Sequence, residues 1–306
     1  MRLHPATEPE EAGAPPDRDE IVQRRRDDDR EAVEELTGTP VEVAGVDDRT
    51  IGGVPVRTYV PEAAAGASGG AVVYLHGGGW VFGSLTTLDG VCRRLADRSG
   101  LVVVSVDYRL APERPWPAAI DDGDAVLTAL TAGELGVADL AVDSARIVVA
   151  GDSAGGFLAA VLVRRARDAG RAVAGQALVY PVIRRAALDD VGDDAGAAEG
   201  LSAGSMRWYW DQFLGAADVA AAAPGELDPM TADLGGLPPA LVLTAEHDVL
   251  CAEGEAYADA LAADGVQVTA NRLLGLPHGF LRKLTVFDAA GRTVDQVAAW
   301  ARGTVG

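Results

Sequence analysis

The stretch RIVVAGDSAGGFLAAVLV, residues 146–163, decides how this chain folds. It begins with the apolar, β-branched run IVVA (147–150), which predicts a buried strand, and it ends with the composition of a helix. Between them, GDSAG (151–155) matches the pattern G-x-S-x-G, in which a serine occupies a sharp turn from strand to helix. Such a turn lifts the hydroxyl above the sheet edge, beside the helix N-terminus. Ser153 is therefore a candidate nucleophile.

Two other serines match the same pattern, so their context must decide. Ser68 lies in AAAGASGG, which precedes a strand and indicates a flexible turn. Ser202 follows an acidic loop instead of a strand, and it suits the N-cap of the helix that comes after it. Neither serine has a strand before it and a helix after it, which favours Ser153 as the nucleophile.

A nucleophilic serine needs a base, and the chain has four histidines. His4 lies in an acidic, proline-rich leader, His76 opens the run HGGGW, and His247 adjoins the end of a strand. His278 follows the last predicted strand and precedes the last predicted helix. Hydrolases built from alternating strands and helices have their catalytic base at this place in the chain. His278 is therefore the candidate base.

The other parts of such a site are an acid that orients the base and a group of oxyanion donors. Glu246 and Asp248 both follow the predicted strand at 240–244, and their spacing does not separate them. Gly77-Gly78-Gly79 follow the predicted strand at 71–75. Glycines let backbone N–H groups turn toward a carbonyl oxygen without obstruction by side chains. These glycines are the candidate oxyanion site.

Short apolar strands alternate with helical patterns along the chain. The predicted strands are 41–46, 54–60, 71–75, 101–106, 146–150, 176–180, 240–244 and 267–274. The predicted helices lie near 87–98, 117–131, 154–168, 251–264 and 289–302. This alternation predicts an α/β fold with a mostly parallel, doubly wound sheet covered on both faces.

Residues 182–235 interrupt the alternation, because they hold far more than one crossover helix. Within them, SMRWYWDQFL (205–214) places Met206, Trp210 and Phe213 on one helical face. Tryptophans this close together inside an insertion favour an apolar lid over a pocket rather than an ordinary packed helix. The side chains expected to line the substrate pocket are Trp80, Trp210, Phe213 and Leu250.

The N-terminal region holds little apolar surface. Residues 1–17 are rich in Pro, Glu and Ala and are expected to be poorly ordered. Residues 18–36 have helical composition but a thin apolar face, mainly Ile21, Val22, Val33 and Leu36, so this helix must lean on another element. The run Asp27-Asp28-Asp29 is expected to form a solvated face paired with arginines rather than a metal site.

Composition excludes several classes of protein. The formal net charge of −20 argues against a nucleic-acid partner, since phosphates need a basic face. Lys283 is the one lysine of the sequence, and two explanations stay open: codon usage in a GC-rich genome, or adaptation of the surface to a salt-rich cytoplasm. No apolar run could span a bilayer, and the N-terminus lacks a secretory signal.

Cys92 and Cys251 form neither a disulfide framework nor a C-x-x-C pair, and we expect both to be small buried hydrophobic residues. Together these features predict a soluble, cytoplasmic protein with no membrane partner. They leave the oligomeric state open, with a homodimer as one possibility.

Five motifs occur in an order that resembles the hormone-sensitive-lipase-like carboxylesterases of the α/β-hydrolase superfamily. They are HGGGW (76–80), DYRLAPE (107–113), GDSAGG (151–156), DPMTADLGGLPPALVLTAEHDVL (228–250) and HGF (278–280). The similarity runs from about residue 45 to 302. The resemblance implies an α/β-hydrolase domain of residues 46–306, with a helical cap built from residues 1–45 and an insertion at about 183–225.

The resemblance also assigns roles to the candidate residues. It implies Ser153 as nucleophile, His278 as base and Asp248 as acid, which settles the choice that spacing left open. It implies the N–H groups of Gly78, Gly79 and Ala154 as oxyanion donors. His76, Asp107, Tyr108, Arg109 and Glu113 are expected to brace the oxyanion loop, and Asp152 to hydrogen-bond neighbouring backbone.

The activity that the resemblance implies is the two-step hydrolysis of short to medium acyl esters, small-molecule substrates, with no metal and no cofactor. Amide, lactone or arylformamide hydrolysis on the same machinery stays an alternative. A receptor-like protein that binds small molecules is a further alternative, which an intact triad disfavours.

Overall fold

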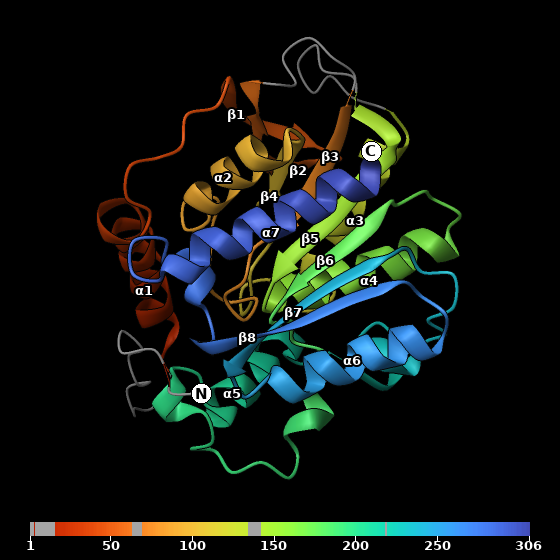
Figure 1. The fold of residues 1–306 in the computed structure, drawn as a ribbon. Coiled ribbons are helices and arrows are strands. Elements are labelled where there is room, and N and C mark those ends of the chain that lie inside the picture. The colour runs from red at the N-terminus through yellow and green to blue at the C-terminus, as the bar shows by residue number, and fades with distance from the viewer. Residues whose placement is uncertain (1–2, 4–15, 63–68, 134–141, 218) are drawn as a thin grey trace.

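The centre of the molecule is an eight-stranded sheet with the order β1-β2-β4-β3-β5-β6-β7-β8 (Figure 1). The computed structural model describes residues 3, 16–62, 69–133, 142–217 and 219–306. The strands are β1 (Gly45–Ile51), β2 (Val54–Val60), β3 (Gly69–Leu75), β4 (Val102–Val106), β5 (Val142–Asp152), β6 (Gly175–Val179), β7 (Ala240–His247) and β8 (Val268–Pro277). Neighbours from β4 to β8 pair in parallel, whereas β2 pairs antiparallel with both β1 and β4. The predicted mostly parallel sheet is confirmed.

Helices cover both faces of this sheet. They are α2 (Asp89–Ser99), α3 (Ala118–Thr131), α4 (Ala154–Asp168), α6 (Cys251–Ala263) and α7 (Asp288–Val305), all where the sequence predicts helices. Along β3, Val72 and Tyr74 are buried with residues of α2 and α7, while Val73 and Leu75 are buried with residues of α3 and α4. Successive side chains of a strand point to opposite faces, so the sheet is doubly wound, as predicted.

The first strand differs from its prediction. The sequence placed a strand at 41–46, whereas β1 runs from Gly45 to Ile51. The tight turn at Gly52-Gly53, where both glycines have positive φ, pairs Ile51 with Val54. That pairing fixes the register of the whole hairpin, so β1 is set by the turn rather than by the apolar run before it.

The long connection between β6 and β7 is built mainly from short helices. It contains η3 (Arg185–Leu188), η4 (Ala197–Glu199), α5 (Ala203–Leu214), η5 (Val219–Ala221) and η6 (Pro229–Thr231). The Ser202 hydroxyl caps α5 by accepting the N–H of Ser205 at 3.0 Å, so the predicted N-cap is confirmed. Figure 1 shows α5 and α1 (Arg18–Glu31) beyond the carboxyl ends of the central strands.

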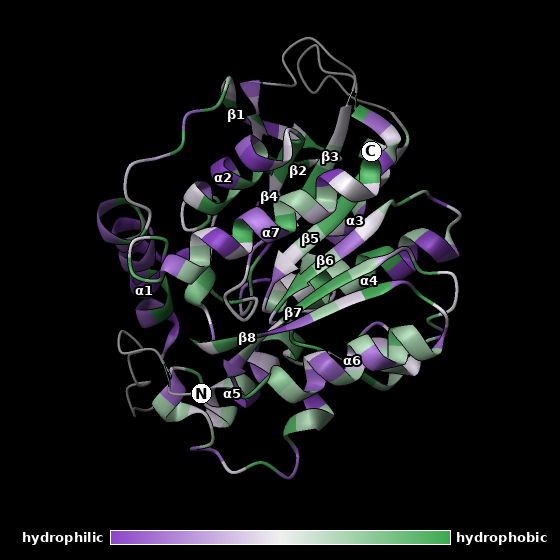
Figure 2. Ribbon diagram, in the orientation of Figure 1, coloured by the Kyte–Doolittle hydropathy of each residue, from purple (hydrophilic) through white to green (hydrophobic). Residues whose placement is uncertain are grey.

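Helix α1 is almost entirely hydrophilic, as its purple colour in Figure 2 shows. Asp17 and Glu20 form a capping box at its start, and a π-helical turn, Ala32–Leu36, extends its end. Ile21 and Leu36 are buried, but Val33, which was expected on the apolar face, is 66% exposed. Of the poorly ordered leader expected at 1–17, residues 1–2 and 4–15 lie outside the described residues, as does Ser68.

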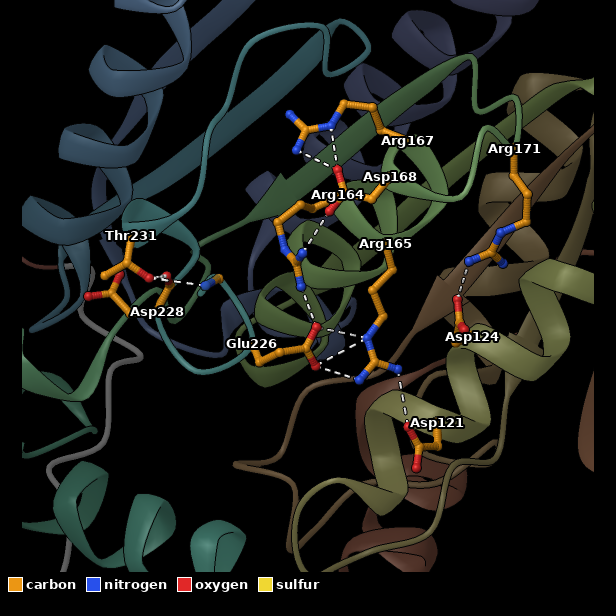
Figure 3. A network of polar contacts seen from close by, with 11 residues as sticks. Asp121, Asp124, Arg164, Arg165, Arg167, Asp168, Arg171, Glu226, Asp228 and Thr231 are labelled. Carbon is orange, nitrogen blue, oxygen red and sulfur yellow. Dashed lines mark hydrogen bonds and ion pairs between the residues drawn. The ribbon is translucent and has the colours of Figure 1, made fainter. Parts of the chain in front are cut away.

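A buried ionic network ties the end of the long connection to α4 (Figure 3). The carboxylate of Glu226 bonds the guanidinium groups of Arg164 and Arg165. Arg165 also donates to Asp121 of α3 at 3.1 Å. Because two arginines neutralise the buried carboxylate, the segment ahead of β7 is fixed to the helix that follows Ser153.

No helix among the residues described is both long and apolar enough to cross a bilayer.

Candidate active site

Ser153 occupies a strained turn between β5 and α4, with φ +54° and ψ −120°. The flanking glycines make this turn sterically feasible. A Cβ at Gly151 would lie 2.3 Å from the carbonyl oxygen of Gly155, and a Cβ at Gly155 would lie 1.9 Å from that of Leu75. The G-x-S-x-G pattern is thus explained by backbone crowding on both sides of the serine.

The structure brings Ser153, His278 and Asp248 into one hydrogen-bonded line. His278 Nε2 lies 2.9 Å from Ser153 Oγ, and His278 Nδ1 lies 2.7 Å from Asp248 Oδ2. Asp248 has no exposed side-chain surface, and its other oxygen accepts the N–H of Leu250 at 2.9 Å. A buried carboxylate on Nδ1 favours the tautomer whose Nε2 can accept the serine proton. The three residues follow β5, β8 and β7, at one edge of the sheet.

Glu246, the other candidate acid, has partners other than His278. Its carboxylate accepts the N–H of Gly275 at 2.7 Å and lies 3.7 Å from the ring of His247. Glu246 is still part of β7, whereas Asp248 lies beyond its end. Strand β7 therefore directs the carboxylate of Glu246 toward β8. Asp248, which lies beyond the strand, is free to reach His278.

Residues 77–82, which we call the glycine turn, follow β3 beside Ser153. Gly78 and Gly79 have φ of +115° and +60°, and the Gly78 carbonyl accepts the N–H of Phe82 at 2.8 Å. A Cβ on Gly79 would collide with the ring of Tyr209 at 2.2 Å. Gly78 and Gly79 line the same cavity as Ser153 and His278. Within the described chain, the N–H groups of Gly78, Gly79 and Ala154 donate no hydrogen bond, so they are available to an oxyanion.

Buried polar groups brace the start of the glycine turn. Asp152 accepts the N–H of Gly77 and the hydroxyl of Tyr74, each at 3.0 Å, as predicted for this carboxylate. The His76 ring stacks on Tyr108, whose hydroxyl donates to the His76 carbonyl at 2.7 Å. Burial lowers the pKa of His76 to about 4, so its ring is neutral at physiological pH.

The other motif residues expected to brace this loop divide between two roles. Glu113 meets Arg25 of α1, at 3.0 Å. Arg109 instead forms a bidentate pair with Asp122 of α3, with donor–acceptor distances of 2.7 and 2.8 Å. The N–H of Asp107 donates to the carbonyl of Pro55, so this residue holds the end of β4 to β2. Arg109 and Asp107 therefore fix neighbouring elements rather than the glycine turn itself.

A cavity of about 440 Å³ opens over Ser153 and His278. Its apolar lining is Phe82, Leu88, Leu201, Met206, Tyr209 and Phe287. Helix α1 contributes Arg24, Asp27 and Asp28 to the lining. The lining is therefore mixed: its apolar side chains come largely from α5 and the glycine turn, and its charged side chains come partly from α1.

The sequence prediction for the pocket side chains is wrong. Among the described residues that line this cavity, Trp80, Trp210, Phe213 and Leu250 are absent, and each is at most 1% exposed. Phe213 stacks on Trp80 with ring centroids 4.3 Å apart, and Trp210 lies 4.6 Å from Trp80. The face of α5 that carries Trp210 and Phe213 packs against the core. Tyr209, which directly precedes Trp210, instead lines the cavity. Met206 belongs to the core face and also reaches the cavity, so helical spacing alone carried no signal for the lining.

The acidic run of α1 also differs from its prediction. Asp27 pairs with Arg30 at 2.8 Å, as expected of a solvated face. Asp28 instead turns toward Arg282 at 3.9 Å, and burial raises its pKa; Asp29 accepts the hydroxyl of Ser84. In the part of the chain that is described, no group of three or more His, Cys, Asp or Glu side chains is placed to hold a metal ion.

The two cysteines, Cys92 and Cys251, are buried free thiols, as predicted.

Comparison with known proteins gives consistent matches. A family model described as the alpha/beta hydrolase fold matches residues 72–282. The chain is 40% identical to the carboxylesterase NlhH of Mycobacterium tuberculosis over 257 residues, 80% of this chain and 78% of that one. It is 36% identical to the ethyl acetate hydrolase of Pseudomonas putida, over 78% of this chain and 74% of that one. The hyperthermophilic esterase of the archaeon Pyrobaculum calidifontis superposes with a TM-score of 0.84 at 38% identity, covering 92% and 93% of the two chains.

Proposed function

Because this chain belongs to the α/β-hydrolase fold family, as a hormone-sensitive-lipase-like carboxylesterase, we propose that Ser153, His278 and Asp248 are its catalytic triad. The observation that carries the proposal is the unbroken line of two hydrogen bonds, 2.9 and 2.7 Å, from hydroxyl to imidazole to buried carboxylate. This is the arrangement that serine hydrolysis requires, with a nucleophile, a base and a group that orients the base.

In the first step His278 Nε2 takes the proton of Ser153 Oγ as that oxygen attacks the ester carbonyl carbon. The carbonyl oxygen becomes an oxyanion and accepts hydrogen bonds from the N–H groups of the glycine turn and of Ala154. His278 then gives its proton to the departing alkoxide, and the alcohol leaves an acyl-serine behind. In the second step His278 takes a proton from water as the water attacks the acyl carbon. The bond between that carbon and Ser153 Oγ then breaks, His278 returns the proton to Oγ, and the acid is released. Asp248 stabilises the imidazolium in both steps.

The substrates are short to medium acyl esters. A cavity of about 440 Å³ lies in the lower part of the usual range for small-molecule sites. Tyr209 and Met206 of α5 line it, which leaves less room for a long acyl chain. The similarity to an ethyl acetate hydrolase supports the same substrate range. Helix α1 and the insertion at about 183–225 act as the cap that closes the site.

Serine replacement tests this proposal, with a matched control in the same sequence pattern. Ser153→Ala should lower the turnover of p-nitrophenyl esters by about a millionfold, as removal of a triad serine does elsewhere. Ser202→Ala removes a helix cap and should leave turnover within a few fold. A Ser153→Ala enzyme of ordinary activity would overturn the triad. Faster turnover of emulsified long-chain triglyceride, or of an arylamide, than of soluble short esters would overturn the substrate range.

A further inference from the structure

One face of α1 lies against the glycine turn. Ile21, Arg25 and Asp29 are spaced four residues apart, so they share a side of the helix. Ile21 is buried in a cluster with Val81 and Phe82. Asp29 accepts the hydroxyl of Ser84, two residues beyond the turn. The helix therefore contacts the turn with a mainly polar face, which explains how so hydrophilic a helix is held in place.

Arg25 is the centre of this contact. Its Nε donates to the carbonyl of Val81, in the glycine turn, at 2.8 Å. One terminal nitrogen donates to the carbonyl of Ala111, also at 2.8 Å. Both terminal nitrogens meet the carboxylate of Glu113 at 3.0 Å. A single guanidinium thus joins two loops that are otherwise linked by a backbone hydrogen bond from Ala111 to the carbonyl of Trp80.

The charges in this contact are partly withdrawn from water. The side chains of Arg25 and Glu113 are 22% and 24% exposed. Although partial burial opposes it, the hydrogen bond from Arg25 holds the pKa of Glu113 below its usual value. Bidentate pairs of this kind are stronger and more directional than a point charge, and a lysine could not reproduce the fork.

The glycine turn needs such support. Trp80 is not a glycine, yet it has a φ of +61°, a conformation that persists where the surroundings hold it. Val81, whose carbonyl Arg25 holds, is its immediate neighbour and lies two residues after Gly79. A shift of Val81 would therefore be passed through a short, strained segment to the N–H groups of Gly78 and Gly79.

We propose that Arg25 is a positioning residue for hydrolysis, which holds the glycine turn so that the N–H groups of Gly78 and Gly79 point at the oxyanion. The proposal rests on the proposed function, because it needs those N–H groups to be the oxyanion donors. It makes α1 a part of the catalytic apparatus as well as a cover for the cavity.

The test compares Arg25→Ala and Arg25→Lys with Arg26→Ala, a change at the adjacent, exposed position of the same helix. In Arg25→Ala, kcat for p-nitrophenyl butyrate should fall by about 10- to 100-fold, since a displacement of about 1 Å costs that much. KM should change little, because the lost interaction belongs to the transition state. The inhibition constant of a trifluoromethyl ketone, which forms an oxyanion on Ser153, should rise by the factor by which kcat/KM falls. The kcat of Arg25→Lys should lie between that of the wild type and that of Arg25→Ala.

Active sites are counted by titration with a p-nitrophenyl phosphonate, which separates positioning from simple loss of folded enzyme. A kcat per titrated site equal to that of Arg26→Ala would overturn the proposal. So would a trifluoromethyl ketone affinity that stays constant while kcat falls. If Arg25→Ala does not fold, Arg25→Lys and Glu113→Gln decide by the same two measurements. A wild-type enzyme that neither hydrolyses esters nor reacts with the phosphonate would refute the proposed function instead.

Discussion

Replacing Phe213 by alanine distinguishes a packed aromatic core from a pocket wall. Phe213 is 1% exposed, stacks on Trp80 at 4.3 Å and meets Phe157 edge-on at 5.9 Å. Truncation of a phenylalanine in such a site costs about 3–5 kcal/mol. With a shift in Tm of about 2–4 °C for each kcal/mol in a large domain, Tm should fall by about 10 °C.

The same substitution should leave the acyl-chain preference unchanged. The space vacated by the ring is enclosed by Trp80, Trp210 and Phe157, and Phe213 is not part of the cavity lining. Relative kcat/KM values for p-nitrophenyl acetate, butyrate, hexanoate and octanoate should therefore keep their order. Tm measured by calorimetry and this series of esters together form the assay.

Tyr209→Ala on the same helix is the matched control. Tyr209 is half-buried, lines the cavity and lies against Gly79. Its removal should lower Tm less than Phe213→Ala does and should shift the preference toward longer acyl chains. If Phe213→Ala instead left Tm unchanged and moved the chain-length optimum, Phe213 would be a pocket wall and not part of the core.

Asp248, Glu253 and the acidic surface each give a further expected outcome. Asp248→Asn should lower kcat by about 10⁴-fold because the wrong imidazole tautomer is held, while Glu246→Gln should stay within a few fold; the reverse ranking would assign the acid to Glu246. Burial raises the pKa of Glu253 from 4.5 to about 8, so the folded protein keeps a proton that the unfolded chain releases. Unfolding free energy in urea should thus decrease as the pH rises from 4.5 to 8, and Glu253→Gln should flatten that slope; identical slopes would contradict it. A salt-adapted acidic surface predicts a Tm that climbs toward molar KCl, where the screening length drops from about 8 to about 3 Å, whereas a flat Tm would leave codon usage as the explanation.

The turn at Ser153, the glycine turn and the central strands could be predicted from the sequence because each is a local pattern. The glycines of GDSAG (151–155) are explained by close backbone contacts within the motif and with the neighbouring strand β3. The position of His278 beside Ser153 could be predicted from chain order, since parallel strands bring their carboxyl ends to one edge of the sheet. Strand β1 was misplaced because a turn, rather than an apolar run, fixes the register of a hairpin.

Other features were decided by tertiary structure alone. Periodicity correctly placed Met206, Trp210 and Phe213 on one face of α5, but it could not say whether that face meets the core or the cavity. Arg25 and Glu113 are 88 residues apart, and nothing in either local sequence signals the other. The sequence by itself determines which side chains share a face, because that follows from backbone geometry. What the face touches depends on how distant elements pack, because that contact is set by the whole fold.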